Sequence, residues 1–509
     1  MAQQQQLNEA RELLRTGRYD AALARLGGYE GWPSPQMEHA ELLRAEVLLR
    51  RDPVDALEAL ARASDLLQHN DETRCQYYIL SGNAYANARN FEGASEMFAR
   101  AESVTQNDVS HLAAIAHQRA RLRCVQGDFD PRDPNLAIAL TSPDPNSRIS
   151  TLLWRSWMHA GTGNYPAQIT DLRAVLALAR EYPDLADYFA LGRTIHSLIR
   201  VACELGDNAA ADDARDLFEA IDWPSELADD QFLCLRAFAW DAFMRGDSAR
   251  AQWLFRDAKE IAPSDAWRVM SHVDRAFVAR MNHNEAWARD ELMQAQAQAR
   301  TVVWAATTGE ERQALVMLAA QFAPVDMGQA QRYVAMYTRM GKDSVDPTHS
   351  HAHDRRTAGY AQIASGRVNQ VLGNTESAVV AFEAAYKIFD EIQHHFRAAL
   401  AAEGLADITG ATVWVERARQ HAGAFPKSAF YKYLTDRVSQ KTTPWIEGLS
   451  SMQRQLALSL CEGLDSQQLS KRFSRSEFTI KREVQALYDL FNVRSRNALR
   501  SALEERGVL

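Results

Sequence analysis

Apolar residues in positions 1–440 recur with helical spacing, and short breaks interrupt them at intervals. Ala, Leu, Arg and Glu, which favour helices, are abundant here, and no stretch of useful length alternates apolar and polar residues as a strand would. Each break has a small or polar pair of residues before a new helix: Gly17-Arg18, Arg89-Asn90, Gly127-Asp128, Gly163-Asn164, Gly206-Asp207, Gly246-Asp247 and Gly373-Asn374. A spacing of roughly 40 residues is typical of stacked helical hairpins. The predicted fold class is therefore all-α, an α-solenoid, with an irregular helical bundle as the alternative.

Two stretches interrupt this pattern more strongly. Pro131, Pro134, Pro143 and Pro145 fall close together, and proline cannot continue a helix interior. We therefore expect one repeat to be distorted or to carry a long loop. A second break at 442–445 predicts a hinge, so the expected organisation is a superhelix over 1–440, a linker over 441–448 and a small domain over 449–509.

The last sixty residues predict three or four short helices. The second of these helices is expected at about 466–473, with Leu469 and Phe473 on one face. Ser476 is a good N-cap for a longer helix that ends near Phe491. Two short helices joined by a tight turn are the layout of a helix-turn-helix. The predicted core shares apolar character and helical spacing: Leu456, Leu460, Leu469, Phe473, Ile480, Val484 and Leu487.

These residues resemble the LuxR/GerE-type DNA-binding domain. The resemblance rests on a series of short matches in order: Leu449-Ser450, Glu462-Gly463-Leu464, Lys471-Arg472-Phe473, Ser476 to Lys481, Tyr488 and Val493 to Arg496. In that family the helix that carries Thr-Ile-Lys enters the major groove. The resemblance implies that base edges are read by Lys481, Arg482 and Gln485. It implies phosphate contacts by Lys471, Arg472, Thr479, Arg494 and Arg496. Domains of this type commonly act as dimers on paired half-sites of double-stranded DNA and recruit RNA polymerase.

Several positions depart from the family pattern. Gln453, Gln455 and Gln468 stand where the family commonly has Glu, and Arg475 replaces an apolar turn residue. Glu483 lies in the predicted groove helix, where the phosphates repel it, although it can accept a hydrogen bond from cytosine N4. The alternative is a helical end-domain that no longer reads DNA and serves as a protein contact.

Individual repeats resemble the tetratricopeptide family. One carries Tyr78, Gly82, Tyr85, Ala94, Phe98 and Ala101 at that family's spacing, and another carries Ala239, Ala242, Ala251, Phe255, Ala258 and Pro263. The longer period resembles the superhelix of the maltose-regulon activator family, which also ends in a LuxR-type domain. Its larger members carry an ATPase, whereas the sequence here has no Gly-x-x-x-x-Gly-Lys-Ser/Thr loop. The concave face of a superhelix can hold a small molecule, a peptide or a protein, so we expect the superhelix to sense one of these.

Charge separates the two regions. The whole chain has a net charge of −9, but 449–509 contains ten Lys and Arg against seven Asp and Glu. Affinity for polyanions comes from local Lys and Arg, so any DNA contact is expected in this basic region only.

Other chemistry is sparse. No membrane span or signal segment is expected, and the five cysteines are scattered, which suits a reducing cytoplasm. His349, His351 and His353 could ligate a metal, but a solvated loop is the favoured interpretation. With no nucleophile–base or metal constellation in the sequence, we expect no enzyme activity and no cofactor. The predicted function is a cytoplasmic transcription regulator, and the alternative is an interaction scaffold whose helix-turn-helix no longer reads DNA.

Overall fold

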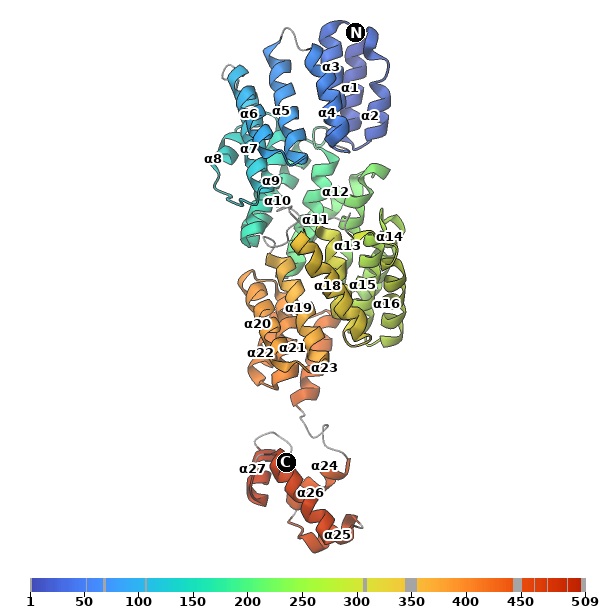
Figure 1. Ribbon diagram of the computed structural model, residues 1–509, viewed down its shortest axis with the longest axis vertical. Coiled ribbons are helices and arrows are strands. Elements are labelled where there is room, and N and C mark those ends of the chain that lie inside the picture. The colour runs from blue at the N-terminus through green and yellow to red at the C-terminus, as the bar shows by residue number, and fades with distance from the viewer. Residues whose placement is uncertain are drawn as a thin grey trace. The chain divides into compact units, whose positions relative to one another are not determined.

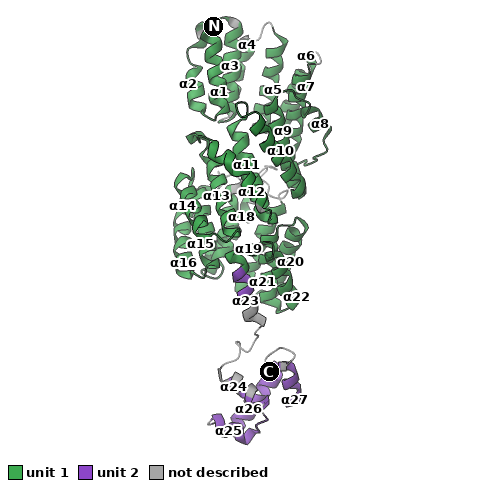
Figure 2. Cartoon of the chain, turned by 180° about the vertical axis from the view of Figure 1, so that it is seen from behind, with its two compact units in different colours: residues 1–431 green, residues 432–509 purple. Residues whose placement is uncertain are grey.

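The computed structural model describes residues 2–51, 53–66, 70–105, 108–304, 309–343, 355–442, 451–461, 463–473, 475–491 and 493–504. In these ranges every regular element is a helix (Figure 1). The chain divides into two compact units, residues 1–431 and residues 432–509 (Figure 2). The predicted linker 441–448 lies almost wholly outside the described residues, as do His349, His351 and His353.

The first unit is a tetratricopeptide-like α-solenoid in which successive helices pair into hairpins. Its first half contains α1 (Ala2–Arg15), α2 (Tyr19–Arg25), α3 (Ser34–Leu49), α4 (Pro53–Leu66), α5 (Asp71–Asn87), α6 (Phe91–Val104), α7 (Val109–Val125), α8 (Pro134–Ala139), α9 (Pro145–Thr162), α10 (Tyr165–Glu181), α11 (Tyr188–Leu205) and α12 (Asn208–Ala220). Its second half contains α13 (Ala228–Met244), α14 (Ser248–Ile261), α15 (Asp265–Met281), α16 (Glu285–Ala299), α17 (Gly309–Phe322), α18 (Met327–Asp343), α19 (Arg355–Val371), α20 (Thr375–Glu391), α21 (His395–Thr409) and α22 (Thr412–Ala422). Helix α23 (Ala429–Thr442) begins in the first unit and ends in the second. Two short 3-10 helices, η1 (Tyr29–Gly31) and η2 (Ser225–Leu227), complete it.

The hairpin turns combine a left-handed residue with a helix cap. Gly163 has φ of 77°, and the Asn164 side chain after it accepts a hydrogen bond from the backbone N–H of Ala167, which caps α10. A glycine adopts this φ at little cost, and an Asn or Asp side chain satisfies a free N–H at the start of the next helix. Gly246 and Asp247 do the same before α14. The predicted breaks are confirmed where such pairs directly precede a helix.

The proline-rich stretch behaves differently from the other turns. The predicted break at Gly127-Asp128 does end α7, but no helix follows at once, because α8 begins only at Pro134 and has six residues. Pro134 and Pro145 each stand in the first turn of a helix, where their missing N–H costs nothing. The prediction of a distorted repeat is confirmed.

Glycine and aromatic side chains set the close packing within hairpins. A Cβ at Gly82 would overlap the ring of Phe98, which is almost fully buried against the partner helix. Phe382 fills the same kind of space against Gly366 and Gly404. The small and aromatic positions that carry the tetratricopeptide resemblance are therefore positions of helix–helix contact.

The superhelix also makes contacts between repeats far apart in sequence. Helix α11 packs against α21. The turn at Gly206 lies against Ala424, and the turn at Gly246 lies against the backbone of Lys427. These contacts place α11, α13, α19 and α21 around one pocket inside the superhelix.

The second unit continues from α23 with four short helices: α24 (Ser451–Cys461), α25 (Ser466–Phe473), α26 (Glu477–Leu490) and α27 (Arg496–Glu504). Its core contains all seven predicted residues, with Phe473 and Val484 only partly buried, and adds Ala457, Phe491, Leu499 and Leu503. Among the residues described in either unit, no helix is long and apolar enough to cross a membrane.

Candidate functional site

Two regions carry concentrated polar chemistry, and the first is the α25–α26 pair. Asp465 accepts hydrogen bonds from the N–H groups of Gln467 and Gln468, and the Gln468 side chain accepts one from the N–H of Asp465. This reciprocal arrangement is a capping box, which Gln performs as well as Glu. The departure from the family pattern at Gln468 therefore leaves the start of α25 intact.

The longer helix of the pair begins as predicted. The hydroxyl of Ser476 accepts a hydrogen bond of 3.2 Å from the N–H of Thr479, and the two side-chain hydroxyls lie 2.9 Å apart. Ile480 and Leu487 point into the core of the unit. Because these residues occupy the buried side of α26, the opposite side is turned toward solvent.

The exposed side of α26 carries the three predicted base-reading residues. Lys481, Arg482 and Gln485 are all exposed, although two of them have partners on the same helix. The Lys481 ammonium lies 3.9 Å from the Glu477 carboxylate, and the Gln485 amide donates a 2.8 Å hydrogen bond to Asp489. Phe478 lies on this side with 79% of its surface exposed. This side of α26 thus carries two cations, two carboxylates and an exposed aromatic ring.

The residues predicted to contact phosphate divide into two groups. Lys471, Arg472 and Arg494 are exposed, and Thr479 is half-buried beside its cap. Arg496 instead donates hydrogen bonds of 2.9 Å to the carbonyl oxygens of Gly463 and Leu464. These bonds tie the first residue of α27 to the turn between α24 and α25, a structural role that sequence reasoning missed.

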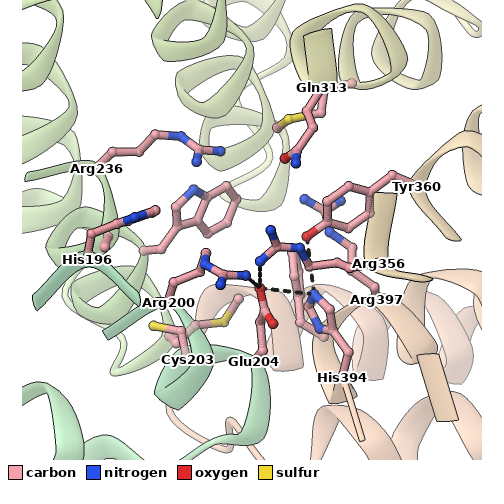
Figure 3. A pocket seen from close by; sticks show the side chains of 15 residues that line it. His196, Arg200, Cys203, Glu204, Arg236, Gln313, Arg356, Tyr360, His394 and Arg397 are labelled. Atoms are coloured by element: carbon pink, nitrogen blue, oxygen red, sulfur yellow. Dashed lines mark hydrogen bonds and ion pairs between the residues drawn. The ribbon is translucent and has the colours of Figure 1, made fainter. Parts of the chain in front are cut away.

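The second region is a pocket inside the superhelix (Figure 3). Side chains from α11, α13, α17 and α19, with others at the start of α21, line about 620 Å³ of empty space, part of it open to solvent. Glu204 lies at its centre. Its Oε1 is 3.0 Å from a guanidinium nitrogen of Arg356, 3.4 Å from one of Arg200 and 3.7 Å from Nε2 of His394. One carboxylate therefore sits between two guanidinium groups.

Two further arginines line the same pocket. Arg236 makes two hydrogen bonds, of 2.5 and 3.3 Å, to the carboxylate of Asp274, which is fully buried. Arg397 lies over the rings of Tyr360 and Phe396, 4.8 and 4.6 Å from their centroids. Within the described residues no carboxylate forms an ion pair with Arg397, and its buried Nε has no hydrogen-bond partner.

The histidines of the pocket add no positive charge near neutral pH. Burial, reinforced by Arg397 and Arg200, holds the pKa of His394 well below its usual range. Burial and the neighbouring arginines lower the pKa of His196 in the same way. Burial raises the pKa of the Cys203 thiol well above its usual range, so it stays protonated. The positive charge of the pocket therefore comes from its arginines.

Sequence reasoning missed this pocket, although the repeats contained a signal. Arginines recur on successive odd-numbered helices or next to their starts at roughly the repeat spacing: Arg200, Arg236, Arg275, Arg312, Arg356 and Arg397. His394, next to the start of α21, also lines the pocket and is 2% exposed. In the described part of the chain no group of three or more His, Cys, Asp or Glu side chains could hold a metal ion.

The sequence matches no protein-family model and no curated protein. Solved structures do match, and two of them illustrate how low the structural similarity is. The crystal structure of the APC/C hetero-tetramer Cut9–Hcn1 is 14% identical, with 86% of this chain and 89% of that chain covered and a TM-score of 0.31. The structure of Naa15/Naa10 bound to HypK-THB is 12% identical, with 99% and 94% covered and a TM-score of 0.22. Because these scores are low, the assignment of the first unit to tetratricopeptide-like solenoids rests on its own helical hairpins.

Proposed function

We propose that this chain is a DNA-binding transcription regulator whose superhelix holds a ligand or partner while the C-terminal unit binds operator DNA. The observation that carries the proposal is the surface of α26. Lys481, Arg482 and Gln485 are exposed on the second helix of a capped helix pair, opposite the buried Ile480 and Leu487. Basic and amide side chains on an exposed helix are suited to the base edges of the major groove.

The resemblance to LuxR-type domains extends the proposal. In that arrangement two copies of the chain bind paired half-sites, in the cytoplasm, and present a surface to RNA polymerase. Half-site spacing then follows from the two-fold symmetry of the dimer. The proposal assigns the chain no catalytic activity.

A titration of duplex DNA with the full-length protein tests DNA binding. We expect affinity to fall with salt, with a slope near −3.6 in a plot of log K against log salt if about four phosphates are neutralised. Lys481→Ala with Arg482→Ala should abolish binding. Arg256→Ala, which removes an exposed arginine from α14, is the matched control and should leave affinity unchanged. A folded protein that does not bind DNA at low salt would contradict the proposal.

A second candidate function is an interaction scaffold whose C-terminal unit contacts protein. It is favoured by the exposed Phe478 and Leu490 on α26, and by the pairing of Lys481 and Gln485 with acidic residues of their own helix. An exposed aromatic ring beside paired charges suits a protein surface better than a phosphate backbone. The same titration separates the two functions, because a scaffold shows no salt-dependent affinity for duplexes.

A further inference from the structure

We propose that the pocket inside the superhelix binds a small hydrophobic monocarboxylate, whose carboxylate pairs with Arg397 and whose aryl or alkyl group lies against Trp240 and Phe396. This ligand class rests on the part of the proposed function in which the superhelix holds a ligand. It does not depend on DNA binding, because the pocket lies wholly within the first unit.

Arg397 differs from the other arginines that line the pocket. Within the described residues it forms no ion pair with a carboxylate. Each of the other three has a carboxylate oxygen within ion-pair distance: Arg356 and Arg200 lie 3.0 and 3.4 Å from Glu204, and Arg236 lies 2.5 Å from Asp274. A cation in a partly closed site is costly without a counter-charge, so an anion bound at Arg397 would stabilise the fold. Because the ligand is assigned to Arg397 alone, one negative charge is sufficient.

Aromatic rings hold the guanidinium of Arg397 in place. Its central carbon lies 4.8 Å from the ring centroid of Tyr360 and 4.6 Å from that of Phe396. Cation–π contacts cover the faces of a guanidinium, whereas its N–H groups lie in its plane and stay available for hydrogen bonds. A carboxylate can accept two parallel N–H bonds from such a group, and little entropy is lost because the group is already fixed.

The start of α21 carries a second nitrogen without a hydrogen-bond partner. Nδ1 of His394, like Nε of Arg397, is buried and has no partner among the described residues, although Nε2 of His394 lies 3.3 Å from the Tyr360 hydroxyl. Buried polar atoms in folded proteins nearly always have a partner. Figure 3 shows Tyr360, His394 and Arg397 on one side of the pocket, with Arg236 across from them. The side that α21 begins is therefore the one suited to the polar end of a ligand.

The pocket also offers an apolar surface to the rest of the ligand. The ring centroids of Trp240 and Phe396 are 5.5 Å apart, and both rings pack against Phe277. Two buried methionines, Met244 and Met317, line the same space. Clustered rings are held in place, and methionine side chains adapt to the shape of an apolar ligand. An apolar surface with one fixed cation is the combination that recognises a hydrophobic carboxylate.

Two pairs of probes test the site in the full-length protein. Sodium phenylacetate and sodium hexanoate carry an aryl and an alkyl group, and phenylacetamide and hexanamide are their uncharged counterparts. Calorimetry should show saturable binding of at least one carboxylate, with an affinity at least about tenfold above that of its amide. Binding of phenylacetate alone assigns the pocket to aryl acids, and binding of hexanoate alone assigns it to alkyl acids. Failure of both carboxylates to bind, or equal affinities for acid and amide, would overturn the proposal.

Variants show whether the carboxylate binds at Arg397. Arg397→Gln should weaken carboxylate binding at least about tenfold and leave amide binding nearly unchanged, whereas an unfolded protein would lose both. Arg397→Lys keeps the charge without the paired N–H groups, so it should retain part of the preference for the acid. Arg256→Gln removes an exposed arginine from α14, outside the pocket, and should change affinity by less than about twofold. An Arg397→Gln protein that still prefers the carboxylate as strongly as the wild type would show that the proposal is wrong.

Discussion

The two units of this chain use positive charge in opposite ways. In the superhelix the guanidinium groups of Arg236, Arg356 and Arg367 lie inside the fold and pair with Asp274, Glu204 and Glu403 respectively. In the C-terminal unit the cations of α25 and α26 lie on the surface, and Lys481 is 66% exposed even in its pair with Glu477. A buried cation must be compensated, whereas an exposed cation can remain available for a distant polyanion.

The difference separates two uses of positive charge. Buried arginines are held in place by the carboxylates with which they pair. Exposed lysines and arginines on a helix keep their freedom and suit an extended polyanion such as DNA, whose affinity depends strongly on salt. Substitutions in the two units should therefore change the free energy of unfolding by very different amounts.

Breaking a buried ion pair should give the largest change. Asp274→Asn leaves Arg236 without a counter-charge inside the superhelix, and we expect a loss of about 3–5 kcal/mol in the free energy of unfolding. Urea denaturation of the full-length protein measures it. Glu477→Gln, which breaks the exposed pair with Lys481, is the matched control and should cost no more than about 1 kcal/mol. Equal effects of the two changes would contradict the contrast between the units.

Acid should destabilise the superhelix through its buried histidines. Burial, with a smaller effect of Arg121, lowers the pKa of His117 to about 4, whereas an unfolded histidine has a pKa of about 6.5. Below pH 6.5 the unfolded state binds the proton first, so stability is lost as pH falls toward 4. His117 alone should account for about 2 kcal/mol between pH 7 and pH 5.

The acid effect is measured by urea unfolding at several pH values. His117→Gln should reduce the difference between pH 7 and pH 5, although it also removes the 3.0 Å contact of Nδ1 with the Thr151 hydroxyl. His196 and His394, whose pKa values are also lowered, should leave a residual dependence of the same sign. A stability that is flat over this range would refute the assignment of neutral buried histidines.

In the C-terminal unit, Arg496 should have a larger structural effect than its neighbours. Arg496→Ala removes the two hydrogen bonds to Gly463 and Leu464, at a cost of about 1–2 kcal/mol. Hydrogen exchange of the α27 amides should become faster. Arg494→Ala, at an exposed position two residues earlier, is the control and should leave exchange unchanged. If Arg496→Ala weakens DNA binding without changing exchange, the residue is a phosphate contact and not a tie between helices.

The smallest effect on stability is expected on the surface of α26. Arg482→Ala should change the free energy of unfolding by less than about 0.5 kcal/mol, because an exposed side chain on a helix contributes little to the fold. If the C-terminal unit reads DNA, the same change should lower discrimination between cognate and random duplexes by about 1–3 kcal/mol. A loss of stability above 1 kcal/mol would show that Arg482 belongs to the fold of the unit.

Local chemistry made much of the fold predictable. Pairs such as Gly163-Asn164 and Gly246-Asp247 end one helix and cap the next within a few residues, so their effect can be recognised without knowledge of the rest of the chain. The bounds of α25 and the cap at Ser476 followed from the same kind of evidence. The exposed positions of Lys481, Arg482 and Gln485 followed from the helical period.

The pocket depended on contacts that no local pattern contains. Arg356 and Glu204 are 152 positions apart, and they meet because α11 packs against α21, which in turn packs against α19. The role of Arg496 also depends on a backbone turn more than thirty positions away. The sequence by itself determined the helices, their breaks and the face that each helix exposes, because these depend on residues within one or two turns. Only the tertiary structure decided which arginines converge and which carboxylates compensate them, because the pitch of the superhelix brings distant repeats together.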